Sequence, residues 1–218
     1  MIRKTFLTAA TAVVLMALSS VARADAVIVG NSTGSLSTAA VSCTFNAQTN
    51  TFQFTITNTS PFDARITGIG FDLVAGDTTG NPNQSPGLGS FSGANVAGFT
   101  FRDGALGNVP QFNSAVLDFG FTTGNNGNFT NGFPNSGLAT GHSLTFTVTG
   151  AAFNGMSEEE ICQAIFVRFQ RVGADGEGSD VGRAGPPEQP VPEPMTMILF
   201  GTGLAGIAAR ARRRRHKE

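Results

Sequence analysis

The chain has 218 residues, of which 40% are hydrophobic and only 13% are charged. This length leaves room for one domain of about 150 residues between two specialised ends, and the apolar content is sufficient for a core. The scarcity of Lys and Glu argues against a helical bundle, whose exposed faces are normally built from these residues. Residues 25–194 hold 14 of the 15 acidic residues and 5 of the 14 basic ones, a formal charge of −9. That charge argues against nucleic-acid binding, which needs a basic face.

Residues 1–24 have the three parts of a secretory signal peptide. Arg3 and Lys4 supply the positive start, and a short apolar stretch covers residues 7–18. Ala22 and Ala24 then form a small-x-small cleavage site, which predicts that signal peptidase cuts before Asp25. The segment predicts export, with the mature chain released from its signal helix.

The C-terminal end also has three parts, in a fixed order. Val191, Pro192, Glu193 and Pro194 form a rigid tetrad that disfavours helix. Residues 195–209 are uncharged and apolar, and as a transmembrane helix they would rise about 22 Å, short of the ~30 Å of a bilayer core. A basic cluster follows, made of Arg210, Arg212, Arg213, Arg214 and Arg215. Arginines can snorkel to the interface, which shortens the gap that the helix must cover. Because basic clusters stay on the cytoplasmic side, this order predicts that residues 25–194 lie on the opposite side of the inner membrane from the cytoplasm.

This C-terminal array resembles the PEP-CTERM sorting signal of Gram-negative bacteria. The resemblance covers residues 191–217 and is specific as an array, whereas the Pro-Glu-Pro tripeptide alone would be weak. It implies transient anchoring in the inner membrane and recognition of Pro192, Glu193 and Pro194 by an exosortase, a membrane Cys protease that removes the tail. It further implies delivery to the cell surface or to the exopolysaccharide matrix. Since the domains attached to such tails vary greatly, the resemblance says little about residues 25–190.

The middle of the chain predicts an antiparallel β domain. Runs of alternating or β-branched residues are separated by clusters of Gly, Asn, Ser and Pro, which is typical of short strands joined by turns. The predicted strands are residues 26–29, 39–45, 51–58, 66–74, 99–101, 112–121, 143–149 and 165–172. Seven or eight such strands indicate an all-β sandwich or jelly roll, which we assign to residues 25–172.

One helix and one tether complete the prediction. Ser157 precedes three glutamates, and Ser157 with Glu160 has the spacing of a capping box, which predicts a short helix ending near Gln163. Residues 173–190 show no hydrophobic period and end Pro-rich, so we predict a flexible acidic tether between the domain and the sorting signal at 191–218.

Two cysteines, Cys43 and Cys162, fall in the exported part. Export permits a disulfide, which would close a loop of about 120 residues. Two separate buried thiols are the alternative, because spacing alone does not bring two Cα atoms within bridging distance.

The densest acidic loop contains Asp175, Glu177 and Asp180 at near-alternating positions with intervening glycines. Such oxygen ligands suit a hard cation, and Ca²⁺ is the only cofactor that the sequence offers. The spacing is not that of an EF-hand, and we favour a solvated turn.

Catalytic patterns are weak. His142 is the single histidine of residues 25–194, and no Gly-x-Ser-x-Gly elbow is present. A glycosidase pair drawn from Asp72, Asp77, Asp103 and Asp118 would need two carboxylates in one cleft. The chain has no Trp or Tyr for sugar platforms, so a carbohydrate-binding module would depend on exposed Phe91, Phe99, Phe129 and Phe133.

These observations predict a non-enzymatic protein with a structural or adhesive role at the cell surface or in the exopolysaccharide matrix. One alternative is a secreted carbohydrate-active protein, either a glycoside hydrolase or a binding module. Another is an uncleaved, single-pass protein whose domain stays in the periplasm.

Overall fold

A computed structural model describes residues 25–74, 87–104, 106–124 and 128–185. Within them, ten strands join edge to edge in one antiparallel sheet, in the order β5-β10-β3-β2-β1-β12-β11-β4-β9-β6. The strands are β1 (Asp25–Gly30), β2 (Gly34–Asn46), β3 (Thr51–Asn58), β4 (Arg65–Phe71), β5 (Phe91–Gly93), β6 (Thr100–Asp103), β9 (Phe119–Thr122), β10 (Ser143–Gly150), β11 (Ile165–Val172) and β12 (Gly178–Gly185). The all-β antiparallel prediction is confirmed for this part of the chain.

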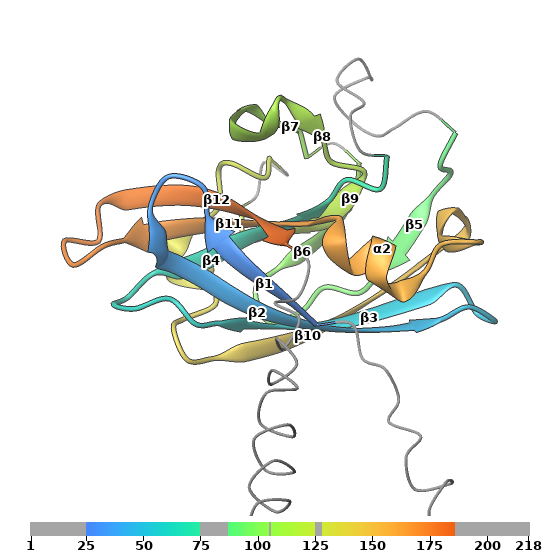
Figure 1. The fold of residues 1–218 in the computed structure, drawn as a ribbon, viewed down its shortest axis with the longest axis horizontal. Coiled ribbons are helices and arrows are strands. Elements are labelled where there is room, and N and C mark those ends of the chain that lie inside the picture. The colour runs from blue at the N-terminus through green and yellow to red at the C-terminus, as the bar shows by residue number, and fades with distance from the viewer. Residues whose placement is uncertain (1–24, 75–86, 105, 125–127, 186–218) are drawn as a thin grey trace, which may run out of the picture. The chain divides into compact units, whose positions relative to one another are not determined.

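The two end strands of this sheet meet across the core. A Cβ atom added to Gly93 on β5 would contact the ring of Phe101 on β6, so the two edges approach without forming a ladder. The sheet is therefore nearly closed. Figure 1 shows β2, β3 and β10 on one side of the enclosed core and β4, β9, β11 and β12 on the other. Where the sequence predicted two separate facing sheets, the structure has one sheet that curls around its core.

Phenylalanine rings fill the space inside the curled sheet. On β3, Phe52, Phe54 and Ile56 point inward and are fully buried, as their alternation with Gln53, Thr55 and Thr57 predicts. Ring centroids lie 5.1 Å apart for Phe54 and Phe146, and 4.4 Å apart for Phe71 and Phe119. Aromatic pairs at such distances add stability beyond their buried area, and they compensate here for the absence of Trp and Tyr.

A second, smaller core lies on the outer face of the sheet. Phe166 of β11 and Val181 of β12 point outward and are fully buried under the segment that follows β6. This cluster also contains Leu106, Val109, Ala115, Leu117 and Phe129. Two short strands, β7 (Asn108–Val109) and β8 (Ala115–Val116), pair with each other in this covering segment.

The predicted strand over residues 112–121 is broken in the structure. A 3₁₀ turn, η1 (Pro110–Phe112), comes first, then β8, and only from Phe119 does the chain join the main sheet as β9. Asn113 and Ser114 both have positive φ, at 54° and 58°. Two successive left-handed residues reverse the chain, which is why the apolar pattern does not continue as one strand.

The predicted tether over residues 173–190 is wrong for residues 178–185. These residues form β12, which lies between β1 and β11 in the middle of the sheet. Val181 is fully buried, and a Cβ on Gly182 would strike the side chain of Ile28 and the backbone of Val29. The small residues that look like a linker permit close approach to β1, so the β domain extends to Gly185 instead of ending at 172.

Candidate functional site

A short helix, α2 (Glu158–Gln163), carries three glutamates in its first turn. The capping box predicted from Ser157 and Glu160 is present: the Ser157 hydroxyl accepts from the Glu160 N–H at 3.2 Å, and the Glu160 carboxylate accepts from the Ser157 N–H at 2.8 Å. Both ends of this exchange satisfy backbone donors that a helix leaves unpaired. The local sequence therefore fixes where α2 begins.

A disulfide ties α2 to the sheet. Cys43 of β2 and Cys162 of α2 are bridged, with their Cα atoms 6.1 Å apart and a sequence separation of 119. Both residues are almost fully buried. The neighbouring Glu158 accepts a hydrogen bond of 2.8 Å from the N–H of Phe45, two residues beyond Cys43 on the same strand. The bridge that the sequence left open thus exists, and it holds the helix against β2.

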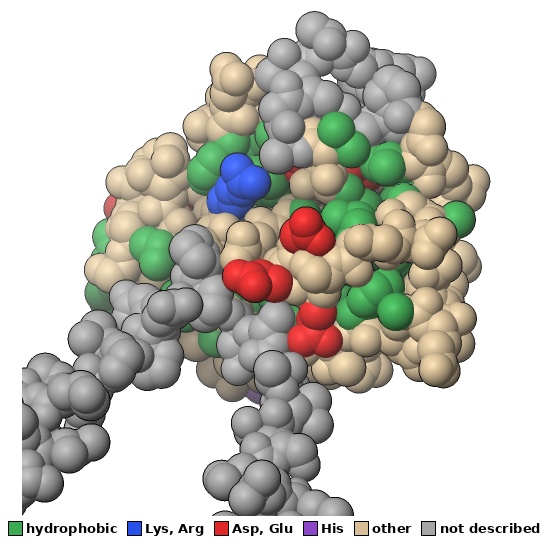
Figure 2. Space-filling model, turned by 45° about the vertical axis from the view of Figure 1, so that its right-hand side comes forward, with side chains coloured by type: hydrophobic (Ala, Val, Ile, Leu, Met, Phe, Trp, Pro, Cys, Tyr) green, Lys and Arg blue, Asp and Glu red, His purple; other side chains and the backbone are tan. Residues whose placement is uncertain are grey.

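Beside α2 lies an open pocket of about 300 Å³. Asp72 comes from the chain just after β4, Glu160 and Gln163 come from α2, and Arg183 comes from β12. The remaining lining is Leu73, Gly155, Met156 and Ala164. Figure 2, which brings the right-hand side of Figure 1 forward, shows acidic and basic side chains close together on an otherwise mostly uncharged surface.

Main-chain contacts hold the pocket walls in place. The Asp72 N–H donates to the carbonyl of Ala164 at 3.1 Å, which joins the end of β4 to the end of α2. The Arg183 guanidinium lies 5.4 Å from the centroid of the Phe166 ring, a cation–π distance that orients it on the outer face. The lining thus combines carboxylate acceptors with guanidinium and amide donors, a set that can form hydrogen bonds with a small polar ligand.

The protonation of Glu160 limits the chemistry of this pocket. Hydrogen bonds from the backbone and the hydroxyl of Ser157 lower the pKa of Glu160, with burial opposing them only weakly. A carboxylate that stays ionised at neutral pH is a poor general acid, because an acid needs a raised pKa to carry its proton. Glu160 is therefore poorly suited to the role of a general acid.

The four acids considered for a glycosidase pair have different surroundings. Asp118 is fully buried and accepts a hydrogen bond of 2.7 Å from the Leu73 N–H. Asp103 accepts one of 3.1 Å from the N–H of Phe91. Asp72 lines the α2 pocket, and Asp77 lies outside the described residues. The sequence did not indicate that Glu160 lines the same pocket as Asp72, because the sequence pattern around Glu160 points only to its role in the capping box.

The acidic loop does not assemble a cation site. Asp180 is 2% exposed, and its Oδ2 accepts from the N–H groups of Ser32 and Thr33 at 2.9 and 2.7 Å. Asp175 and Glu177 are exposed in the turn before β12. Within the described part of the chain, no three His, Cys, Asp or Glu side chains form a group that could hold a metal. Asp180 instead fastens the β1–β2 turn to β12, and its position in a strand corrects the expectation of a solvated turn.

The predicted phenylalanine platform is not formed. Phe91, Phe99 and Phe129 are buried in the cores at 5%, 1% and 0% exposure, and only Phe133 of the four is exposed. The histidine considered for catalysis, His142, is exposed in the turn before β10. It is held there through its main chain, since its carbonyl accepts from the Asn58 N–H.

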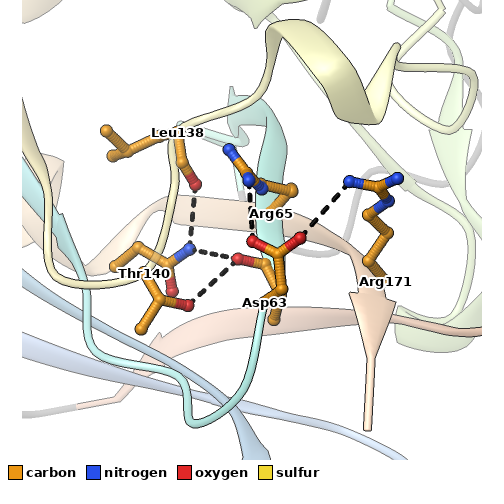
Figure 3. Close-up of polar contacts among 7 residues, drawn as sticks. Asp63, Arg65, Leu138, Thr140 and Arg171 are labelled. Carbon is orange, nitrogen blue, oxygen red and sulfur yellow. Dashed lines mark hydrogen bonds and ion pairs between the residues drawn. The ribbon is translucent and has the colours of Figure 1, made fainter. Parts of the chain in front are cut away.

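A charged cluster that the sequence did not predict lies near the loop between β3 and β4. Asp63 pairs with Arg65 at 2.7 Å and with Arg171 of β11 at 3.3 Å, as Figure 3 shows. Nearby, Asn58 donates to the carbonyls of Ala64 and Leu138 at 2.8 and 2.9 Å. Because these side chains are paired with one another or with main-chain carbonyls, we assign the cluster a structural role in closing the loop between β3 and β4.

The predicted sorting and processing residues lie outside the described residues. They are Ala22 and Ala24 of the cleavage site, the tetrad from Val191 to Pro194, the apolar segment 195–209 and the arginines from Arg210 to Arg215. Among the residues that are described, no helix has the length and apolarity needed to span a membrane.

A comparison with known protein families decides the nature of the C-terminal end. Residues 190–214 match the PEP-CTERM protein-sorting motif. The chain carries a PEP-CTERM sorting signal. It is thus an exported protein that an exosortase sorts toward the cell surface. Neither the curated proteins nor the solved structures gave a match to the chain.

Proposed function

We propose that this PEP-CTERM protein is a non-enzymatic structural or adhesive component of the cell surface or of the exopolysaccharide matrix. The observation that carries the proposal is the sequence order: a β domain, closed by a disulfide, ends at Gly185, and the sorting motif begins five residues later at 190. A rigid, oxidised domain of this kind suits the space outside the cytoplasm.

The proposed route has three steps. Signal peptidase removes residues 1–24 during export, and the apolar segment 195–209 holds the chain in the inner membrane for a time. An exosortase then cuts near the tetrad from Val191 to Pro194 and releases the β domain outward. The arginines that follow the apolar segment stay cytoplasmic and keep the chain in place until the cut.

Mass measurement tests this route. The protein is recovered from membrane and extracellular fractions of its native culture, and its intact mass and C-terminal peptides are mapped. We expect an extracellular chain that starts at Asp25 and ends near Pro194. A chain found only in the membrane with its Arg-rich tail intact would instead support the single-pass periplasmic alternative.

A matched pair of variants ties the result to the motif. In one variant Pro192, Glu193 and Pro194 are all replaced by Ala, and in the control Pro187, outside the matched range, is replaced by Ala. We expect the first variant to accumulate uncut in the membrane and the control to behave as wild type. Release of the triple variant with a normal C-terminus contradicts the proposed role of the motif.

A second candidate, a secreted carbohydrate-active protein, is favoured by one observation. Asp72 and Glu160 line the same 300 Å³ pocket, with Arg183 and Gln163 beside them. The lowered pKa of Glu160 opposes an acid role for it. Incubating the extracellular protein with a panel of polysaccharides and measuring new reducing ends distinguishes the two: release that disappears in Asp72→Asn favours the second candidate, and no release favours the first.

A further inference from the structure

The outward face of β2, β3 and β10 is an uncharged array of hydroxyl groups. No residue of these three strands is acidic or basic, although the domain as a whole is acidic. We call this surface the hydroxyl face and define it by the outward residues of the three strands: Thr38, Ala40, Ser42, Thr44, Thr51, Gln53, Thr55, Thr57, Ser143, Thr145, Thr147 and Thr149.

Strand register arranges these side chains in rows. Thr145 of β10 lies opposite Thr55 of β3, which lies opposite Ser42 of β2. The next row along holds Ser143, Thr57 and Ala40 in the same way. Neighbouring strands are about 4.8 Å apart and alternate residues about 6.7 Å apart, so the face repeats on the scale of a sugar ring and its hydroxyls.

Cross-strand hydrogen bonds fix the hydroxyl groups in position. The side-chain oxygens of Thr55 and Thr145 are 2.8 Å apart, and those of Thr57 and Ser143 are 2.7 Å apart. Thr51 and Thr149 form a third pair at 3.2 Å. Threonine is already stiff about its first side-chain torsion, so these groups lose little further freedom when a ligand binds.

A shallow hollow interrupts the array beside β1. It has a volume of about 200 Å³, and the outward apolar side chains that line it are Val27 and Ala40. Ala26 and Val41 also border it, although their side chains belong to the inner core. Its hydroxyl lining is Ser42, Thr55 and Thr57. Val27 and Val29 of β1 stand 48% and 47% exposed next to it, which extends the apolar strip. The small side chain of Ala40 leaves the space open.

We infer that the hydroxyl face binds a neutral polysaccharide, with one sugar ring seated in the hollow at Ala40. A pyranose ring has an apolar C–H face and a rim of hydroxyls, and the hollow offers an apolar floor with a rim of hydroxyls that can each donate and accept. Charge decides against an ionic polymer, because an anionic or cationic chain would gain no complementary charge from β2, β3 or β10. The inference rests on the proposed function, which brings the domain among extracellular polysaccharides.

Two variants of the exported protein test the site. Ala40→Glu fills the hollow and adds a charge, and the Thr55→Val/Thr145→Val double variant removes one hydroxyl pair while keeping the shape of the face. Ser179→Glu is the matched control, since it adds the same charge to an exposed position on β12, outside the hydroxyl face. Thermal unfolding of every variant establishes that the domain is folded before binding is measured.

Binding is measured by retention on insoluble cellulose and by affinity electrophoresis in gels containing dextran, with alginate as the anionic comparison. We expect wild type and Ser179→Glu to be retarded by at least one neutral polymer and not by alginate. Ala40→Glu should bind about tenfold more weakly, a change of about 1.4 kcal/mol, and the double Val variant should also bind more weakly. Equal binding by Ala40→Glu and wild type, preference for alginate, or no binding to either neutral polymer overturns the inference.

The two proposals fail in different ways. An extracellular, correctly cut protein that ignores cellulose and dextran leaves the proposed function standing and removes the hydroxyl face as a binding site. An uncut protein confined to the membrane removes the proposed function, whatever the purified protein binds.

Discussion

The carboxylate of Asp180 on β12 accepts two hydrogen bonds of 2.7 Å from Thr33, one from the backbone N–H and one from the hydroxyl. The two residues are 147 positions apart in the chain. Oδ2 also accepts from the Ser32 N–H, and Oδ1 accepts from the Val181 N–H. One buried carboxylate thus satisfies the donors of the turn between β1 and β2 and joins that turn to the last strand of the domain.

Replacing Asp180 by Asn should destabilise the domain by about 1–3 kcal/mol. The Asn amide presents N–H groups where the carboxylate accepts on both oxygens, so at least one buried donor loses its acceptor. Urea unfolding of wild type and Asp180→Asn measures the difference. Glu177→Gln, at an exposed position in the preceding turn, is the control and should change stability by less than about 0.5 kcal/mol. Equal midpoints for Asp180→Asn and the control would show that the turn does not depend on the carboxylate.

The contribution of Asp180 should also depend on pH. Burial raises the pKa of Asp180, but the hydrogen bonds from Thr33, Val181 and Ser32 outweigh it, and the pKa is lowered overall. Burial lowers the pKa of Arg168, and the nearby Asp180 charge opposes that shift. Because the folded state holds the ionised carboxylate, its stabilisation is complete above the unfolded pKa and is lost as pH falls through the folded one.

Unfolding free energies of wild type and Asp180→Asn, measured from pH 6 to pH 2, test this dependence. We expect the difference between the two proteins to be constant down to about pH 4 and to shrink below it. Asp63→Asn, which removes the exposed partner of Arg65 and Arg171, serves as the comparison. A wild-type advantage over Asp180→Asn that persists unchanged at pH 2 contradicts the assignment.

The disulfide between Cys43 and Cys162 should supply a large part of the stability. It closes a loop of 119 residues, for which chain entropy predicts about 4–5 kcal/mol. The Cys43→Ala/Cys162→Ala double variant should therefore unfold at a much lower urea concentration than wild type. Reductant should lower the midpoint of wild type and leave that of the double variant unchanged. Because both sulfurs are buried, reduction should be slow unless the domain is partly unfolded.

Local features of this fold could be predicted from the sequence, and distant pairings could not. The capping box of Ser157 and Glu160 spans three residues, and the β2–β3 hairpin is joined by a short polar turn, so each is specified by neighbours in the chain. In contrast, β12 has Val181 as its single large apolar residue, and its partner on one side is the first strand. Its small residues fit because Ile28 and Val29 come close. The sequence around residue 180 gives no indication of this contact with a strand about 150 residues earlier in the chain.

The candidate site shows the same limit. The sequence offers Asp72 as a candidate acid, but its pocket partners Glu160 and Arg183 come from a helix and a strand more than 80 residues away. Arg183 in particular lies in the predicted tether, where nothing in the sequence indicates that its guanidinium would line a pocket. The hydroxyl face, by comparison, is visible in the alternation of threonines along residues 51–57 and 143–149, yet the register that aligns them appears only in the structure.

Gly120 should be among the least replaceable residues of the domain. It lies opposite Gly70 where β9 pairs with β4, and a Cβ at Gly120 would strike the backbone carbonyl of Ile69 and approach the Gly70 Cα to 3.0 Å. Backbone atoms within a ladder cannot move aside as a side chain can, so Gly120→Ala should cost about 3 kcal/mol, the upper end of ordinary overpacking. Gly185→Ala is the matched control, because among the described residues its Cβ would meet only the Val27 carbonyl, at 3.9 Å. Thermal and urea unfolding of both variants decide the matter: if Gly120→Ala is as stable as Gly185→Ala, the close contact between β4 and β9 does not exist in solution.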